Sequence, residues 1–354
     1  MRAMRLHRPD DISRRPLRLE EVPEPVPGPG QIRVQVTCCG VCRTDLHIVE
    51  GELPPRLQPV IPGHQVVGTV AAVGTDARRF RLGERVGVAW LHRVCGGCEF
   101  CGHPEGRENL CRAAEFTGWT VDGGYAEAVV VDEAFAYSLP ESIPDESTAP
   151  LLCAGTIGYR ALRLTGARPG ERVGLYGFGG SAHITIQVAR HLEMEVFVCS
   201  RSEANRALAV RLGAAWAGSA DDAPPVKLHA AIVFAPSGPV VLKALEHVER
   251  GGTVALAGIY MSPIPAMDYT RHLYDERSLR SVANATRRDA IELLKLSAEI
   301  PIRPRTTPFP LEAANEALEA LKSGRVAGSA VLRCAGSSQG STSLRACQTI
   351  AEAL

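Results

Sequence analysis

The chain has 354 residues, enough for about two domains that each bury a core. Its 39 Lys and Arg residues balance 39 Asp and Glu residues, which disfavours nucleic acid or an anionic membrane as a partner. No apolar run approaches the ~20 residues of a transmembrane helix, and polar residues interrupt the first ten positions, where a signal peptide needs an apolar segment. We therefore expect a cytoplasmic protein, in which metal or catalytic roles of the eleven cysteines are favoured over disulfides.

The first 150 residues have the pattern of short strands interrupted by glycine and proline. Gln31–Val36 alternates polar and apolar side chains, and Val66–Val73 and Tyr125–Val131 are apolar runs. Four closely spaced prolines exclude a helix just before the first of these strands. This part predicts a β-rich domain with long loops.

From Leu151 onward, strands and helices alternate. The expected strands are Arg172–Tyr176, Glu195–Cys199, Ala230–Phe234 and Thr253–Ala257, and the expected helices are Ser181–His191, Ser202–Leu212 and Val240–Val248. Repeated β-α-β units predict a doubly wound parallel sheet with helices on both faces.

The chain beyond Asn284 predicts two helices, Arg288–Ala298 and Leu311–Ser323, and a last strand at Gly328–Leu332. This stretch can close back onto the first domain. The Ser- and Gly-rich segment 334–354 predicts a mobile tail.

Four cysteines lie within 17 residues of each other, and three of them are separated by only two residues. They are Cys95, Cys98, Cys101 and Cys111. Four thiolates can surround one Zn²⁺ tetrahedrally and leave no open position, which is typical of a structural site. The alternatives are a loop of unliganded thiols and a zinc ribbon of a nucleic-acid-binding protein, but zinc ribbons normally lie in a basic context and this loop is acidic.

A second set of metal-binding residue types is dispersed along the chain: Cys42, His64 and Cys153. Two thiolates and one imidazole leave a fourth position on zinc for water or substrate, which is the form of a catalytic site. Taken singly, either cysteine could be a small buried apolar residue, and His64, after a Pro-Gly pair, could be a turn histidine.

A glycine-rich turn follows the expected strand Arg172–Tyr176 and opens the next helix. Its residues Gly177, Gly179, Gly180 and Ser181 predict a pyrophosphate site, because glycine admits the ligand close to the backbone and the helix N-terminus favours anions. An ordinary strand-to-helix turn is the alternative.

The next strand ends without the Asp or Glu that binds the ribose 2′-hydroxyl of NAD. Ser200, Arg201 and Arg206 instead offer a hydroxyl and two guanidinium groups, which suit the 2′-phosphate of NADP. The alternative is that both arginines simply face solvent.

Seven motifs occur in an order and at intervals that resemble the zinc-dependent medium-chain dehydrogenase/reductase family, the zinc-containing alcohol dehydrogenases. They are GVCRTDLH, PGH, CGGCEFC, GRENLC, DGGYAE, CAG and YGFGGSAH. The resemblance covers residues 1–333 and implies an α/β fold. A GroES-like catalytic domain would comprise 1–150 and 290–333, and a Rossmann coenzyme domain 151–289.

The resemblance implies roles for single residues. Cys42, His64 and Cys153 match the catalytic zinc ligands. Asp45 matches the carboxylate that orients the ligand histidine. Thr44 and His47 match the hydroxyl and the outer histidine of a proton path.

Arg43 matches a residue that pairs with the coenzyme pyrophosphate. Trp90 resembles a tryptophan that narrows the substrate pocket, and Trp119 is a second pocket candidate; a plain core aromatic is the alternative for Trp90.

The resemblance predicts an alcohol dehydrogenase with two Zn²⁺ per chain that interconverts an alcohol and an aldehyde or ketone and favours NADP(H) over NAD(H). The expected partners are a small-molecule substrate and further copies of the chain, as a homodimer or homotetramer. The alternatives are a zinc-binding reductase, a polyol dehydrogenase, or a non-catalytic zinc-binding relative.

Two features depart from the family pattern. Gln65 follows His64 where most members have Glu. A neutral amide therefore replaces the nearby carboxylate that is proposed to assist ligand exchange on zinc. The loop before Cys111 is two residues longer than usual at Gly102–Glu105.

Five cysteines have no predicted ligand role. Cys38, Cys39 and Cys199 are expected to be small apolar residues, and Cys334 and Cys347 to be exposed thiols in the tail that are open to oxidation.

Overall fold

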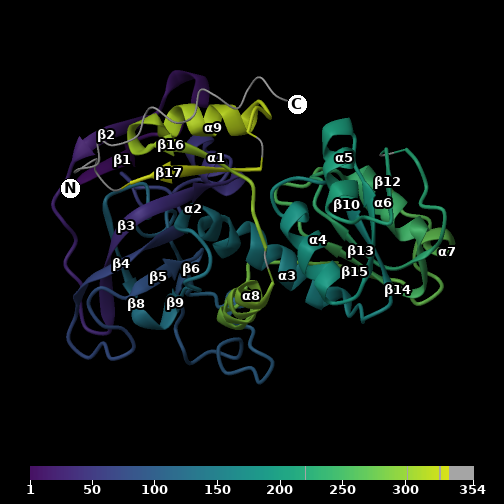
Figure 1. Cartoon of the computed structure of the whole chain (residues 1–354), viewed down its shortest axis with the longest axis horizontal. Helices are drawn as coiled ribbons and strands as arrows, with labels where there is room; N and C mark the ends of the chain where they lie inside the picture. The colour runs from purple at the N-terminus through teal and green to yellow at the C-terminus, as the bar shows by residue number, and fades with distance from the viewer. Residues whose placement is uncertain (220, 301, 327, 335–354) are drawn as a thin grey trace, which may run out of the picture.

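The computed structural model describes residues 1–334 apart from positions 220, 301 and 327. Two halves lie side by side: a seven-stranded half, and a parallel half built on a six-stranded sheet (Figure 1). In the part of the chain that is described, no helix combines the length and apolarity needed to cross a bilayer. Most of the predicted tail, including Cys347, lies outside the described residues.

The seven-stranded sheet combines strands from early in the chain with the last two described strands. Its strands are β3 (Gln31–Val41), β4 (Gln65–Val73), β5 (Arg85–Val88), β8 (Ala128–Asp132), β9 (Ala136–Ser138), β16 (Thr306–Pro310) and β17 (Ser329–Arg333). β17 pairs antiparallel with β3, so the last described strand lies beside a strand from early in the chain (Figure 1). Two small antiparallel sheets flank it, formed by β1 (Arg2–Leu6) with β2 (Leu17–Glu21) and by β6 (Leu91–Arg93) with β7 (Glu115–Phe116).

The parallel half contains the predicted doubly wound sheet. Its strands are β10 (Arg172–Tyr176), β11 (Glu195–Cys199), β12 (Trp216–Gly218), β13 (Leu228–Val233), β14 (Val248–Leu256) and β15 (Ser278–Ser281). They lie in the order β12-β11-β10-β13-β14-β15 and all pair in parallel, which confirms the predicted sheet. This order reverses beside β10, and ligands bind at such a switch point.

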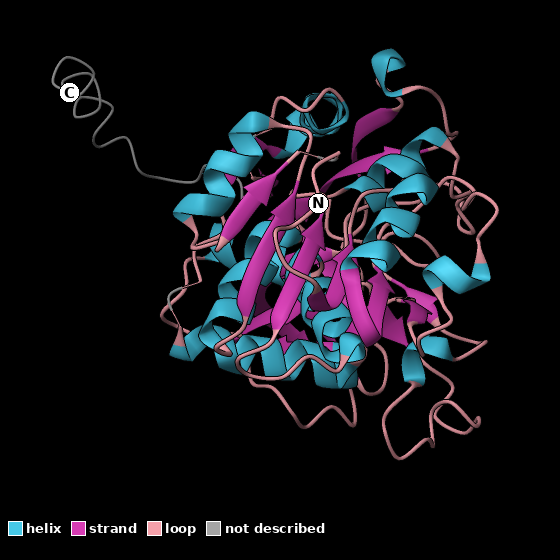
Figure 2. Cartoon of the chain, turned by 90° about the vertical axis from the view of Figure 1, so that its right-hand side faces the viewer, coloured by secondary structure: helices cyan, strands magenta, loops and turns pink. Residues whose placement is uncertain are grey.

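Helices lie on both sides of the strands of the parallel half (Figure 2). The helices of the parallel half are α3 (Ala154–Thr165), α4 (Ala182–His191), α5 (Glu203–Arg211), α6 (Gly238–His247) and α7 (Tyr269–His272). Helix α8 (Arg287–Glu299) lies where the two halves meet (Figure 1). Those of the seven-stranded half are α1 (Arg43–Glu50), α2 (Asp145–Thr148) and α9 (Ala314–Lys322). Single 3₁₀ turns are η1 (Ile12–Arg14), η2 (Glu108–Leu110), η3 (Glu133–Phe135), η4 (Ala149–Leu152) and η5 (Leu311–Ala313).

Helix α8 crosses the domain boundary predicted at residue 290. Its buried Leu293 and Leu294 share one apolar cluster with Leu152 of the seven-stranded half and Leu175 of the parallel half. The predicted helix Leu311–Ser323 is divided, because η5 precedes α9. The predicted domain boundaries stay a prediction.

Cys334 differs from its prediction as an exposed tail thiol. It is fully buried, because the chain continues beyond β17 along β3: the Cys334 N–H donates to the Thr37 carbonyl at 3.0 Å, and its thiol donates to the Gly124 carbonyl at 3.4 Å. Burial raises the pKa of this thiol to about 12, so it is neutral and shielded from oxidants.

Candidate metal centres and coenzyme site

Cys42, His64 and Cys153, here called the buried ligand group, come together from three separate segments. Cys42 caps the N-terminus of α1, His64 precedes β4, and Cys153 lies between η4 and α3. The ligand atoms of the three side chains all lie within 4.8 Å of one another. The structure thus gathers all three predicted residues of this set.

The spacing of the buried ligand group fits a zinc ion. Tetrahedral bonds of ~2.3 Å to sulfur and ~2.0 Å to nitrogen place the two ligand atoms about 3.5 Å apart. The Sγ of Cys42 lies 3.4 Å from the Nε2 of His64. This distance is the one expected for two ligands of the same zinc ion.

Asp45 orients the buried ligand group from behind. Its carboxylate accepts from Nδ1 of His64 at 2.8 Å, which directs Nε2 toward Cys42. It also accepts hydrogen bonds from the backbone N–H groups of Cys42, at 2.9 Å, and Gly63, at 3.2 Å. The side chain is fully buried, so these donors replace its hydration.

The pKa values of the buried ligand group indicate which of its side chains carry protons that a metal ion would displace. Burial lowers the pKa of His64 most strongly, but the charges of Asp45 and Cys42 outweigh it and raise the pKa to about 10. A hydrogen bond from Cys153 is the main reason that the pKa of Cys42 lies well below its usual range; the same bond raises the pKa of Cys153. A thiolate beside a protonated imidazole is a site where a divalent cation can replace protons.

Aromatic rings form a wall beside His64. Trp90 meets its imidazole edge-on, with ring centroids 5.0 Å apart, and stacks on Phe116 at 5.1 Å and Trp119 at 5.8 Å. The Trp119 indole N–H donates to the Pro54 carbonyl at 2.8 Å. Both predicted pocket residues therefore lie at one apolar surface, together with Phe116, which no motif indicated.

Of the remaining predicted residues of α1, Thr44 contacts the buried ligand group. The Thr44 backbone N–H donates to the Cys42 sulfur at 3.3 Å. Thr44 and His47 are three residues apart on α1 and so share a helix face. Arg43 begins α1 and is exposed.

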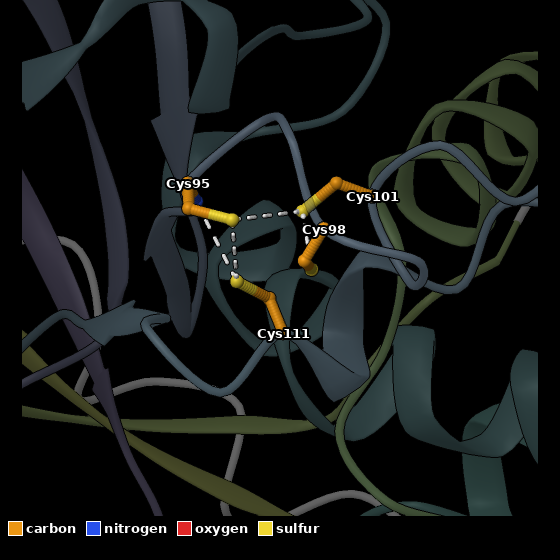
Figure 3. A group of neighbouring side chains, drawn as sticks. All are labelled: Cys95, Cys98, Cys101 and Cys111. Atoms are coloured by element: carbon orange, nitrogen blue, oxygen red, sulfur yellow. Dashed lines mark hydrogen bonds between the residues drawn. The ribbon is translucent and has the colours of Figure 1, made fainter.

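The four cysteines from Cys95 to Cys111, here called the cysteine loop, point toward a common centre (Figure 3). Sulfur–sulfur distances are 3.9 Å for Cys95 and Cys101, 3.5 Å for Cys98 and Cys101, and 3.6 Å for Cys95 and Cys111. A tetrahedral zinc with ~2.3 Å bonds needs about 3.8 Å between sulfurs, so the set fits that ion.

The cysteine loop lies at the surface, with Cys95 exposed and only Cys111 buried. A hydrogen bond from the Gly97 backbone N–H is the main cause that lowers the pKa of Cys95 to about 6, whereas desolvation raises the pKa of Cys101 to about 12. The thiolate needed for metal binding is therefore already favoured at Cys95.

Hydrogen bonds tie the end of the cysteine loop to the segment before α8. The buried Glu108 accepts the Arg287 backbone N–H at 3.0 Å and its guanidinium at 3.4 Å. The Asn109 side chain donates to the Ala283 carbonyl at 2.6 Å, and Asn284 donates back to the Asn109 carbonyl at 3.4 Å. Because Cys111 ends the same 3₁₀ turn, a metal on the cysteine loop would also fix this connection.

The glycine-rich turn after β10 has the shape of an anion cradle. Gly177 has a φ of 90° and its N–H donates to the Cys199 carbonyl; a Cβ there would lie 2.8 Å from the Ala235 nitrogen, so only glycine fits. At Gly179 a Cβ would meet nothing within 4 Å, which leaves space before α4. Ser181 is the N-cap of α4, whose first N–H groups can bind a pyrophosphate.

The predicted ribose site at the end of β11 contains both arginines, in different environments. Arg201 is exposed, whereas Arg206 donates to the carbonyls of Ser200 at 2.9 Å and Arg201 at 3.1 Å. Ser200 is buried. Arg206 thus stiffens the turn that carries Arg201.

Comparisons with known proteins match this arrangement along the chain. Residues 28–141 match the model described as alcohol dehydrogenase GroES-like domain, and residues 180–299 match that of zinc-binding dehydrogenase. The predicted GroES-like and Rossmann combination is thereby confirmed.

Several whole proteins are similar as well. A probable alcohol dehydrogenase AdhA of Mycobacterium tuberculosis is 49% identical over 337 residues, which are 94% of this chain and 97% of that protein. An alcohol dehydrogenase of Geobacillus stearothermophilus is 36% identical over 90% of this chain and 95% of its own length. A solved cinnamyl alcohol dehydrogenase of Sorghum bicolor is 27% identical, with a TM-score of 0.85 over 96% of this chain and 99% of that one.

Proposed function

Because this chain belongs to the zinc-dependent medium-chain dehydrogenase/reductase family, we propose that it interconverts an alcohol and its aldehyde or ketone by hydride transfer with NADP(H). The observation that carries the proposal is the convergence of Cys42, His64 and Cys153, with Asp45 behind the imidazole. Three protein ligands leave a fourth position, as catalytic zinc requires.

The residues around the buried ligand group divide the work. Zinc, when held by that group, supplies a positive charge that makes an alcohol hydroxyl easier to ionise. Thr44 and His47, on one face of α1, would lead the hydroxyl proton toward solvent. The apolar surface of Trp90, Phe116 and Trp119 would hold the carbon skeleton and exclude water.

The turn after β10 and the end of β11 would hold the coenzyme, which supplies or accepts the hydride. Gly177, Gly179, Gly180 and Ser181 would cradle its pyrophosphate, and Arg43 would pair with it from α1. Ser200, Arg201 and Arg206 favour a 2′-phosphate, since no carboxylate ends β11.

Three further points belong to this proposal. Two Zn²⁺ per chain are expected, one in the buried ligand group and one in the cysteine loop. A homodimer or homotetramer and a cytoplasmic location stay predictions from the sequence.

Steady-state kinetics over a panel of alcohols and aldehydes, with NADP(H) and NAD(H) compared, tests the proposal. We expect a higher kcat/KM with NADP(H), and Arg201→Ala to lower that preference by about 10- to 100-fold, the loss of one hydrogen bond between charged groups. Arg211→Ala, at the exposed end of α5, is the matched control. Equal use of both coenzymes would contradict the preference; zinc-loaded protein inactive on the whole panel would contradict the activity.

A further inference from the structure

The imidazole of His47 is held from two sides by residues that no motif indicated. Its Nδ1 is hydrogen-bonded to the carboxylate of Glu52. Its ring stacks on Tyr260, with centroids 4.5 Å apart and an interplanar angle of 26°. Tyr260 follows β14 in the parallel half, so this stack joins the two halves.

A tight turn brings Glu52 back to His47. Helix α1 ends at Gly51, which has a φ of 81° and donates its N–H to the Ile48 carbonyl at 3.2 Å. The Leu53 N–H then donates to the His47 carbonyl at 2.9 Å. These two hydrogen bonds fold the segment over the last turn of α1 and set the carboxylate beside the ring.

His47 and Glu52 differ in their exposure to solvent. The His47 side chain is 11% exposed and that of Glu52 is 49% exposed. Glu52 can therefore exchange protons with solvent, whereas His47 is screened on one face by Tyr260.

We propose that Glu52 is a positioning residue for His47: it holds the neutral imidazole with its proton on Nδ1 and leaves Nε2 as the proton acceptor. A carboxylate beside a histidine sets the tautomer in this way and stabilises the imidazolium that forms when Nε2 is protonated. In the oxidation direction the O–H bond of the alcohol breaks and its proton reaches Nε2. The carbinol C–H bond breaks as well, its hydrogen leaves as hydride to the coenzyme, and a C=O bond forms. The imidazolium then returns to neutral by releasing one proton to water.

Tyr260 completes the arrangement by covering the ring. It adopts a φ of 54°, which is unfavourable for any residue except glycine by about 1–2 kcal/mol, so other interactions must hold it there. The stack on His47 is such an interaction. It restricts the plane of the ring, and the hydrogen bond to Glu52 selects the flip in which Nδ1 faces the carboxylate.

The role of Glu52 rests on the proposed function, but the tautomer can be measured without turnover. The ¹⁵N NMR spectrum of histidine-labelled, coenzyme-free protein in alkaline buffer distinguishes the two tautomers, and the His47→Asn spectrum assigns the signals. We expect the Nδ1–H form in the wild type and in Glu52→Gln, whose amide oxygen still accepts. Glu52→Ala should shift it toward Nε2–H. A wild type in the Nε2–H form, or an unchanged tautomer in Glu52→Ala, overturns the proposal.

Kinetics provide the second readout. Glu52→Ala should lower kcat for alcohol oxidation about 10- to 100-fold, with the KM for alcohol changed less than about twofold, because a hydrogen bond behind a catalytic ligand or base has effects of that size. The kcat of Glu52→Gln should lie between those of the wild type and Glu52→Ala. Glu141→Ala, an exposed carboxylate between β9 and α2, is the control. Wild-type kcat in Glu52→Ala contradicts the role of Glu52, whereas inactivity of the wild type itself contradicts the proposed function.

Tyr260 is tested by a pair of variants. Tyr260→Phe keeps the ring and should leave the Nδ1–H signal of His47 as in the wild type. Tyr260→Ala removes the stack and should broaden that signal through faster exchange with water. Equal signals in Tyr260→Ala and the wild type would contradict the covering role.

Discussion

The buried ligand group and the cysteine loop are built from the same chemistry in opposite surroundings. The buried group combines two sulfurs with one imidazole, and Asp45 orients it from a fully buried position. The cysteine loop has four sulfurs at the surface, where backbone N–H groups favour a thiolate at Cys95. On the proposed function, the buried ligand group would hold the catalytic zinc with one open position, and the cysteine loop would hold a structural zinc.

The largest expected effect comes from removing a ligand of the buried group. Cys42→Ala should lower kcat/KM at least about 1000-fold, because several kcal/mol of transition-state stabilisation are lost with the ion. Mass spectrometry of the native protein should show one zinc per chain in place of two, while NADP(H) binding persists. Cys38→Ala, a buried thiol of β3, is the control. Full activity in Cys42→Ala would remove the catalytic role from this group.

The next effect concerns the carboxylate that distinguishes the two groups. Asp45→Asn keeps the size of the side chain but removes the charge that faces His64 and the backbone N–H of Cys42. Zinc affinity of the buried group should fall about 10- to 100-fold, and that of the cysteine loop should not change. Competition with a chromogenic chelator measures both sites. An equal loss of zinc affinity at both sites would mean that Asp45 stabilises the whole fold rather than the buried ligand group.

Removing the metal of the cysteine loop should lower the stability of the protein more than its kcat. Cys98→Ala leaves three ligands in an exposed loop, so we expect one zinc per chain and a Tm lower by about 5 °C or more, a loss of a few kcal/mol. The kcat should remain within about tenfold of the wild type. Calorimetry measures the Tm, and zinc analysis counts the bound ions. A kcat loss in Cys98→Ala as large as that in Cys42→Ala would contradict a purely structural role of the cysteine loop.

Local patterns explain why so much of this comparison could be predicted from the sequence. The spacing of Cys95, Cys98 and Cys101 places three sulfurs within one loop whatever surrounds it, and the alternation after Leu151 fixes the parallel sheet. The residue types of the buried ligand group indicate a metal site, but only the family resemblance assigns its members, because they are far apart along the chain and the fold brings them together.

Residues whose roles depend on long-range packing gave no signal. Tyr260 reaches His47 from the other half of the molecule, and Phe116 joins Trp90 only because β6 and β7 pair. The serine- and glycine-rich segment after Cys334 predicts a tail that includes this residue, yet Cys334 extends the pairing with β3 and is buried. Periodicity and composition describe a segment, not the neighbour that covers it.

The smallest expected effect tests whether the cysteine loop also supports the contact between the halves. Glu108 accepts two hydrogen bonds from Arg287, at the start of α8, and lies in the turn that ends at Cys111. Glu108→Ala leaves the Arg287 backbone donor without its acceptor, which costs about 1–3 kcal/mol and lowers Tm by a few degrees. Hydrogen exchange should quicken in the peptide containing residues 283–287, with zinc content and kcat preserved. The same exchange rate in Glu108→Ala as in Glu105→Ala, an exposed carboxylate of the same loop, would show that the loop stabilises itself and not the connection to α8.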